Sequence, residues 1–230
     1  MTERFNLGRT NYQRVRDIIR NDIITGQFRD GDRLKISDLV GRYGISAMPI
    51  REALQQLQGE GLVVMSANRG ASVRRIDEHF LWQMYEIRKA LEMFFVVELA
   101  GRATAQDVGR MRDVLGRQEQ AIAAGSEENL QKLDLEFHGM IVGATKNEAA
   151  AAILSRTYDL TQPLRLRFGR SPEQARRIPT DHRAIIEAIA QHDGPRASRL
   201  ISEHINGAFA DLADAMRLED DSIRKGLVKG

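Results

Sequence analysis

The sequence has no cysteine, which excludes disulfide bridges and cysteine-ligated zinc sites. No apolar run approaches the ~18 residues that a membrane-spanning helix needs, so no membrane partner is expected. The first residues, MTERFNLGRTNYQ, lack the apolar core of a secretory signal peptide. The 230 residues suffice for one large or two modest domains, and the 42% that are hydrophobic suffice for a packed core. A cytoplasmic protein is the default expectation.

The small net charge of +2 conceals an uneven distribution. Residues 1–75 carry thirteen Lys and Arg against eight Asp and Glu, a net charge of +5. Residues 76–230 carry twenty-one against twenty-four, a net charge of −3. A basic segment joined to a mildly acidic one suits a polyanionic partner at one end only. Random surface variation also produces imbalances of this size, so the imbalance gains weight only from the motif found in the same segment.

A helix-turn-helix pattern occupies residues 36–62. Apolar residues within Ile36–Tyr43 have the spacing of one buried helix face. Gly44 can end this helix, because glycine adopts positive φ at little cost. Ser46 can cap a second helix, and Pro49 is tolerated in its first turn, where a missing N–H costs little.

The second helix would bury Ile50, Leu54 and Leu57 and leave polar side chains outside. Two short helices around a glycine often serve only for packing, but here two β-prone runs follow. Leu62–Met65 and Ser72–Arg75 flank a loop with a basic tip. A helix pair with such a hairpin predicts a winged helix that places its second helix in a DNA major groove.

We expect residues 1–10 to be disordered and residues 11–76 to form this winged domain. Its first helix would span Tyr12–Thr25, where apolar residues recur on one face, and Gly26–Leu34 would be a turn-rich link.

From Asp77 onward the patterns are helical and no strand signal recurs. Pro163 should kink one helix, and Pro179 should interrupt another. The fold class is therefore mainly α: an N-terminal winged helix-turn-helix domain, then an all-helical bundle over residues 77–217 and a loose tail at 218–230. The helices are expected at residues 77–103, 104–124, 126–145, 148–169, 171–191 and 195–218.

One polar cluster is predicted inside the bundle. Asp134 and His138 lie four residues apart and share a helix face that apolar residues flank. His182 and His204 also occupy inward-facing helical positions. An unpaired buried carboxylate would be costly, whereas an Asp and three His satisfy one another around a divalent ion. Zinc is the first expectation, and nickel, manganese and iron also accept this ligand set.

Each histidine taken singly also fits an ordinary core position. His79, at a helix start, and His192, in a turn, are assigned to that class. For the other three, the i, i+4 pairing with an aspartate and the two later inward positions favour the metal site.

Residues 11–76 resemble the winged-helix DNA-binding domain of the GntR family of bacterial transcription regulators. The most specific mark is the run PIREAL at Pro49–Leu54, followed by EGL at Glu60–Leu62. The other matching residues are Ile23, Gly26, Gly31, Leu34, Ile36, Leu39, Gly44, Ile45, Ser46, Leu57 and Gly70.

One departure from this family concerns DNA recognition. The family usually has an arginine directly after the serine, where this chain has Ala47. Recognition should therefore depend on Ser46, Arg51 and the wing. Bases would be met by Ser46, Arg51 and Gln55, and phosphates by basic residues and the wing. The full predicted set is Arg33, Lys35, Arg42, Ser46, Arg51, Gln55, Arg69 and Gly70.

Residues 77–217 resemble the FCD domain, the ligand-binding domain of the FadR subfamily of GntR regulators. Its marks are IRKALE at 87–92, LDLEFH at 133–138, KN at 146–147, DHRAIIEAI at 181–189 and ASRLISEHI at 197–205. In the metal-binding members of that family an Asp and three His occupy these motifs. All four are present here, as Asp134, His138, His182 and His204.

The resemblance implies a small carboxylate or hydroxy acid as the effector, bound at open positions of the metal ion. Such a ligand also needs a cationic or polar partner away from the metal. For Arg88 the alternative is an intrahelical pair with Glu92, and for the two later arginines it is a solvated face. The predicted effector-binding residues are Arg88, Asn147, Arg165 and Arg167.

Together these patterns predict a homodimeric, ligand-responsive regulator of double-stranded operator DNA, not an enzyme, with repression as the first expectation. The alternative is a helical-bundle metalloenzyme, a hydrolase or isomerase, with Glu136 or Glu203 as base. Glu203 directly precedes His204 and so points about 100° away from it, and Glu136 lies two residues from both Asp134 and His138 and so points about 160° away from them. No nucleophile motif is present. A helical protein-interaction module would leave the inward Asp and His residues unexplained.

Overall fold

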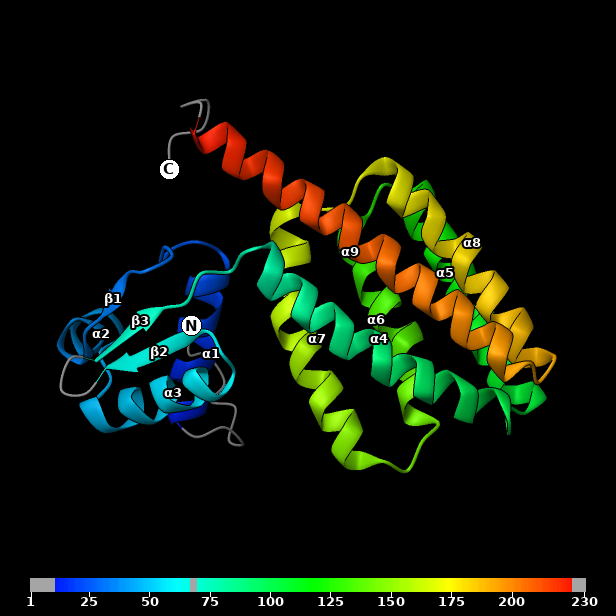
Figure 1. Ribbon diagram of the computed structural model, residues 1–230, viewed down its shortest axis with the longest axis horizontal. Helices are drawn as coiled ribbons and strands as arrows, with labels where there is room; N and C mark the ends of the chain where they lie inside the picture. The colour runs from blue at the N-terminus through cyan, green and yellow to red at the C-terminus, as the bar shows by residue number, and fades with distance from the viewer. Residues whose placement is uncertain (1–10, 67–69, 225–230) are drawn as a thin grey trace, which may run out of the picture. The chain divides into compact units, whose positions relative to one another are not determined.

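The computed structural model describes residues 11–66 and 70–224. By its internal contacts the chain divides into two compact units, Met1–Asp77 and Glu78–Gly230. The described residues of the first unit form three helices and a small antiparallel sheet with strand order β1-β3-β2 (Figure 1). Its elements are α1 (Asn11–Ile24), β1 (Arg33–Leu34), α2 (Ile36–Tyr43), α3 (Ala47–Gly59), β2 (Val63–Ser66) and β3 (Gly70–Val73).

The helix-turn-helix forms as the sequence predicts. Gly44 follows α2 with a φ of 64°, and Ser46 directly precedes α3. Ile50, Leu54 and Leu57 on α3 are fully buried against the rest of the unit. Because α3 packs on α1 through this face, its opposite face is left to solvent.

The sequence did not predict β1, which lies in the segment expected to be a turn-rich link. Leu34 pairs with Ala71 in the register of β1 and β3. The backbones approach closely here: a Cβ atom on Gly70 would lie 2.5 Å from the carbonyl oxygen of Leu34, and Gly70 has a φ of 82°. A two-residue strand is too short to give a periodic signal, so only this pairing defines it.

The second unit is a bundle of helices (Figure 1). The helix α4 lies along α9, α8 packs on α9, and α5 packs on α6 and α8. None of the helices in the described residues is long and apolar enough to cross a membrane. Their bounds are α4 (Glu78–Ala100), α5 (Ala105–Ala123), α6 (Glu127–Gly143), α7 (Glu148–Phe168), α8 (Pro172–Ala190) and α9 (Gly194–Arg224).

Two expectations about where helices are interrupted or end were wrong. Pro179 does not interrupt α8; the residue is buried inside a continuous helix, so packing compensates for the lost backbone hydrogen bond. The tail expected from residue 218 is helical as far as Arg224, because no glycine or proline stops α9 there. An ion pair of 2.6 Å between Arg167 and Glu219 holds this last part of α9 against the end of α7.

Candidate functional site

The four predicted metal ligands lie together inside the bundle. Asp134 and His138 come from α6, His182 from α8 and His204 from α9. One potential ligand atom from each residue lies within 4.8 Å of the other three, and all four residues are buried. The i, i+4 spacing places the first two side chains on one face of α6, and the packing of α8 and α9 supplies the other two.

The outer nitrogens of two of the rings are fixed by side chains that the sequence analysis did not identify. His182 Nδ1 lies 2.9 Å from the side-chain oxygen of Gln118. His204 Nδ1 lies 3.2 Å from a carboxylate oxygen of Asp181. Since both partners are acceptors, each Nδ1 carries the hydrogen and each Nε2 keeps its lone pair. Metal-binding histidines are typically oriented in this way.

The third ring is oriented by a buried carboxylate. His138 Nδ1 donates to Glu92 at 2.5 Å, and the hydroxyl of Tyr158 donates to the same carboxylate at 2.7 Å. Burial alone would raise the pKa of Glu92, but His138, Arg88 and Tyr158 all stabilise its ionised form and lower the pKa to about 2. The charge of Glu92 therefore keeps the hydrogen of His138 on Nδ1 and leaves Nε2 as an acceptor.

The Nε2 atoms of the three histidines and Oδ1 of Asp134 face a common centre. Few hydrogen atoms are available there to join them. The Nε2 atoms of His182 and His204 lie 3.4 Å apart. Oδ1 of Asp134 lies 3.6 Å from His182 Nε2 and 3.8 Å from His138 Nε2, and it is buried without a hydrogen-bond partner. Converging lone pairs around an unsatisfied buried oxygen fit a divalent cation with nitrogen and oxygen ligands.

The surroundings of His182, His204 and Asp134 shift their pKa values toward the protonation states that bind a metal. Burial lowers the pKa of His182 well below its usual range, and nearby His204 adds to the effect. Burial also lowers the pKa of His204. For Asp134, burial alone would raise the pKa, but the surrounding histidines and Arg170 outweigh it and hold the pKa below the usual range. Neutral imidazoles and an ionised carboxylate are the protonation states that metal binding requires.

Arg88 reaches the same centre from α4. Its Nη2 lies 3.0 Å from His138 Nε2, its Nε donates to Glu92 at 2.6 Å, and its guanidinium stacks over the ring of Tyr158. The expected intrahelical pair with Glu92 therefore exists and is buried. It does not remove Arg88 from the site, because the pair itself lies beside His138.

A second arginine, Arg170, was not predicted to belong to the site. Its side chain is buried, and Nη2 lies 3.3 Å from Oδ2 of Asp134 while Nη1 donates to Glu127. Arg170 follows the end of α7 in a loop without periodicity, so no sequence pattern marks it. Arg88 and Arg170 both line a small cavity of about 20 Å³ at the cluster, which is room for about one water molecule.

The other predicted effector-binding residues are placed differently. Arg165 lines this cavity but is engaged by Asp211 at 2.6 Å and by two backbone carbonyl oxygens, those of Gly169 and Ala208. Arg167 pairs with Glu219 and lies apart from the cavity lining. Asn147 is exposed and caps α7, its side chain accepting from the backbone N–H of Ala150. The structure therefore gives Arg167 and Asn147 local roles at helix ends.

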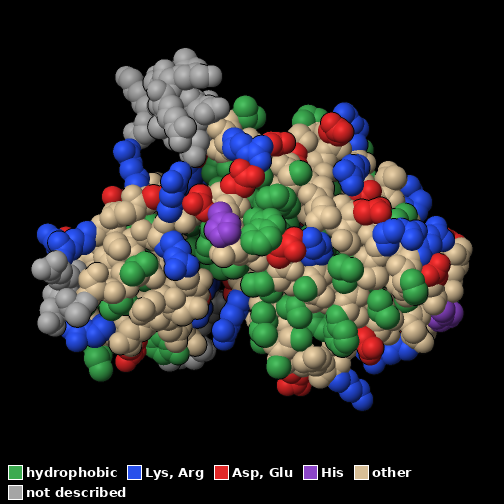
Figure 2. Space-filling model, in the orientation of Figure 1, with side chains coloured by type: hydrophobic (Ala, Val, Ile, Leu, Met, Phe, Trp, Pro, Cys, Tyr) green, Lys and Arg blue, Asp and Glu red, His purple; other side chains and the backbone are tan. Residues whose placement is uncertain are grey.

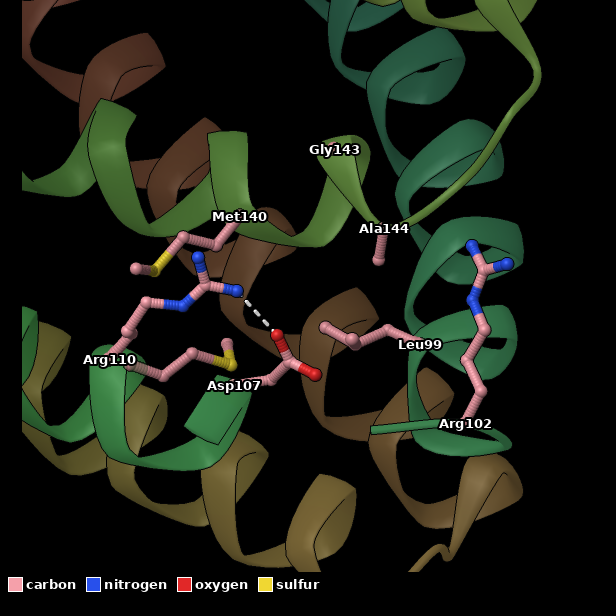
Figure 3. Close-up of a pocket in the computed structure, with 8 residues that line it drawn as sticks. Leu99, Arg102, Asp107, Arg110, Met140, Gly143 and Ala144 are labelled. Atoms are coloured by element: carbon pink, nitrogen blue, oxygen red, sulfur yellow. Dashed lines mark hydrogen bonds and ion pairs between the residues drawn. The ribbon is translucent and has the colours of Figure 1, made fainter. Parts of the chain in front are cut away.

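A larger hollow, of about 330 Å³, lies elsewhere in the bundle (Figure 3). Arg110 and Arg102 flank it, and Asp107 bonds to Arg110 between them (Figure 3). None of the predicted ligands lines it. Both arginines are exposed, and Asp107 already completes the capping box at the start of α5 with Thr104. Size alone therefore does not mark the functional site, and the chemistry points to the buried cluster.

The predicted DNA-contacting residues are mostly exposed on the first unit. Arg33, Lys35, Ser46, Arg51 and Gln55 all have exposed side chains. Arg42 is also exposed, but it pairs with Asp22 at 2.9 Å and stacks over Phe28. Gly70 is required by its close approach to β1, and Arg69 lies outside the described residues.

Both units of the chain match known protein families. Residues 11–73 match the family of bacterial regulatory proteins called the gntR family, and residues 83–207 match the FCD domain. The Nta operon transcriptional regulator of Aminobacter aminovorans is 31% identical over 84% of this chain and 90% of its own length. The transcriptional repressor GlaR of Escherichia coli is 29% identical over 86% of this chain and 94% of its own. The structure of McbR/YncC from E. coli superposes with a TM-score of 0.68 at 19% identity, covering 90% of this chain and 98% of that one.

These matches define a class of helix-turn-helix transcription regulators with a helical ligand-binding domain. The chain belongs to the GntR family, in the FadR-like group that carries an FCD domain. It is a ligand-responsive, DNA-binding regulator and not an enzyme. The metalloenzyme alternative is thereby set aside.

Proposed function

We propose that this regulator binds a divalent metal ion through Asp134, His138, His182 and His204, and that a small carboxylate or hydroxy acid acts as its effector there. The observation that carries the proposal is the set of converging Nε2 lone pairs around the unsatisfied Oδ1 of Asp134. Zinc suits four nitrogen and oxygen ligands, and nickel, manganese or iron would leave further coordination positions open. When bound, the ion would supply a positive centre that attracts a carboxylate.

Arg88 is the effector-binding residue that the contacts favour. His138 Nε2 can serve either Arg88 or a metal ion, but not both. With a metal ion on that nitrogen, the Nη2 hydrogens of Arg88 would lack their present acceptor beside the site. Buried N–H hydrogens without an acceptor are costly, and an effector carboxylate would accept a charge-assisted hydrogen bond from Nη2 while Glu92 stays bound to Nε.

We also propose that the protein acts as a homodimer through an exposed apolar surface on α4 and α7. Ile87, Phe94 and Val97 on α4 and Ile153 on α7 are between 38% and 50% exposed. Figure 2 shows hydrophobic side chains gathered over these two helices. A second copy of the chain would cover this surface, and a two-fold dimer matches a two-fold operator.

The helix α4 connects the two activities of the chain. It begins at Glu78, directly after the last residue of the first unit, and carries Arg88 and Glu92 into the site. An effector that binds Arg88 would therefore act on α4, the helix that follows the DNA-binding unit in the chain. The affinities for effector and operator must then depend on each other reciprocally. With operator DNA as partner, we place its action in the cytoplasm.

The test is a thermal-shift screen of metal-loaded protein against small carboxylates and hydroxy acids. An acid that binds only the folded state raises the melting temperature, and the same acid should change operator occupancy in a footprinting assay. The matched control is the Arg88→Lys protein, which keeps one positive charge but loses the two-pronged donor. A shift that is equal in both proteins would remove Arg88 from the effector site.

A further inference from the structure

The outer face of α3 is the part of the first unit that a major groove would receive. Four exposed side chains lie on this face within the first three turns of the helix: Ala47, Met48, Arg51 and Gln55. The residues between them that point the other way, such as Ile50 and Leu54, are fully buried. A recognition helix meets base edges with its N-terminal residues, so the first two positions of α3 should bear directly on sequence recognition.

Those two positions carry apolar side chains and no charge. Met48 is 67% exposed, more than the other large apolar side chains that the described part of the first unit exposes, Val64 at 47% and Ile18 at 43%. Ala47 beside it is also exposed. The first cation on this face is Arg51, and no hydrogen bond or ion pair within the described residues engages its guanidinium.

The chemistry of the major groove restricts what such a surface can recognise. Guanine, adenine and cytosine present hydrogen-bond donors and acceptors there, and thymine alone adds an apolar group, its C5-methyl. Phosphates and guanine edges favour cations, which Ala47 and Met48 lack. A thioether and a methyl group gain by removing apolar surface from water, and the thymine methyl is the apolar surface that a base edge offers.

We propose that Met48, with Ala47 beside it, recognises thymine in the operator by contact with the C5-methyl group. The inference rests on the proposed operator binding. Arg51 lies three residues further along the same face and suits guanine, and Gln55 suits adenine. Each half-site should therefore combine a thymine with a guanine or adenine read from the next turn of α3.

The experiment first obtains a duplex by selection from a random pool with the full-length protein. Each thymine of the enriched half-site is then replaced singly by uracil, which removes the C5-methyl group and leaves the hydrogen-bonding edge unchanged. At one position the replacement should weaken binding roughly fourfold, the factor that corresponds to ~0.8 kcal/mol for one buried carbon group. Replacement in both half-sites should weaken binding by roughly the square of that factor.

Variants of the protein identify the side chain responsible. With Met48→Ala, the sensitive thymine should no longer be distinguished from uracil, whereas Met48→Leu should keep the distinction because it keeps an apolar side chain. Val64→Ala changes another exposed apolar residue of the same unit and should leave the distinction intact. Wild type and Met48→Ala, each measured on thymine and uracil duplexes, form a cycle that isolates the contact.

The outcomes separate this inference from the proposed function. If the selection enriches no sequence, operator binding itself fails. If a sequence is enriched but uracil at every thymine leaves its affinity unchanged, operator binding stands and the role of Met48 is overturned. If Met48→Ala weakens binding to thymine and uracil duplexes equally, Met48 contacts some other part of the complex, and the inference is again overturned.

Discussion

His182 and His204 point their Nε2 atoms at each other across 3.4 Å, while Nδ1 of each ring is held from outside by an acceptor. Two neutral rings oriented in this way bring two lone pairs together, and burial lowers the pKa of both rings and so opposes protonation. Neither Nε2 atom then offers the other a hydrogen, so the pair favours a cation between the rings. A metal ion there would satisfy both nitrogens and the unpaired oxygen of Asp134 at once.

The first prediction follows from this pair. Replacing His182 or His204 by alanine removes one of four ligands, so the purified variant should lose most of its metal on elemental analysis. The His79→Ala protein is the control, because His79 stacks on Trp82 at the surface and lies outside the cluster. Full metal occupancy in both cluster variants would refute the ligand set.

A second prediction concerns Asp181, which touches the outer nitrogen of His204 rather than the centre. The Asp181→Ala protein should keep all four ligands but bind the metal 10- to 100-fold more weakly, the loss typical of such orienting residues. Competition with a chelator measures the affinity. Glu203→Ala, an exposed neighbour of His204 paired at 3.9 Å with Arg199, is the matched control and should bind the metal as wild type does.

The sequence predicted the four residues that lie together in the cluster but not the side chains that orient them. The spacing of Asp134 and His138 on one helix predicts that both face inward. For His182 and His204, the apolar neighbours predict the same. Gln118 and Asp181 give no such signal, because their role depends on how α5 and α8 pack beside the histidines. Glu92 was recognised only as a possible partner of Arg88, since its contact with His138 spans 46 residues of sequence.

The fold shows the same division between local and long-range information. The helix pair around Gly44 was predicted correctly, because the residues that end a helix and those that form its buried face lie close together in sequence. The strand β1 and the passage of α8 through Pro179 were not, because pairing with β3 and burial of the proline override the local preference. Local sequence patterns therefore predict most helices and strands, and tertiary contacts determine the structure where it departs from those patterns.

The third prediction is a pH dependence of stability in the metal-free protein. Because the pKa of His182 and His204 is lowered in the folded state, the unfolded chain binds more protons just below the ordinary value of 6.5. Their contribution to stability is therefore complete above pH 6.5 and is lost as the pH falls below it. The melting temperature, followed from pH 7.5 to 5 in the presence of a chelator, should fall with this sign, and less steeply for His182→Gln.

The fourth prediction tests the proposed dimer surface. Phe94→Glu places a charge in the middle of the exposed apolar residues of α4, where a partner would have to bury it. The variant should sediment as a monomer at concentrations where the wild type is a dimer. Leu135 on α6 is exposed to a similar extent, 41% against 49%, so Leu135→Glu serves as the control and should stay dimeric. A dimeric Phe94→Glu protein would place the interface elsewhere.

The last prediction separates base recognition from phosphate binding on the first unit. Arg51→Ala should weaken binding to the selected operator by roughly 1–3 kcal/mol and relax the choice of base at one position, since a guanidinium on the face of α3 reads a base edge. Lys35→Ala, before α2, should weaken binding to all duplexes to a similar degree and reduce the slope of affinity against salt concentration by about 1. Titrations at several salt concentrations, on the operator and on an unrelated duplex, measure both effects. If the two variants behave alike on both duplexes, α3 does not recognise bases through Arg51.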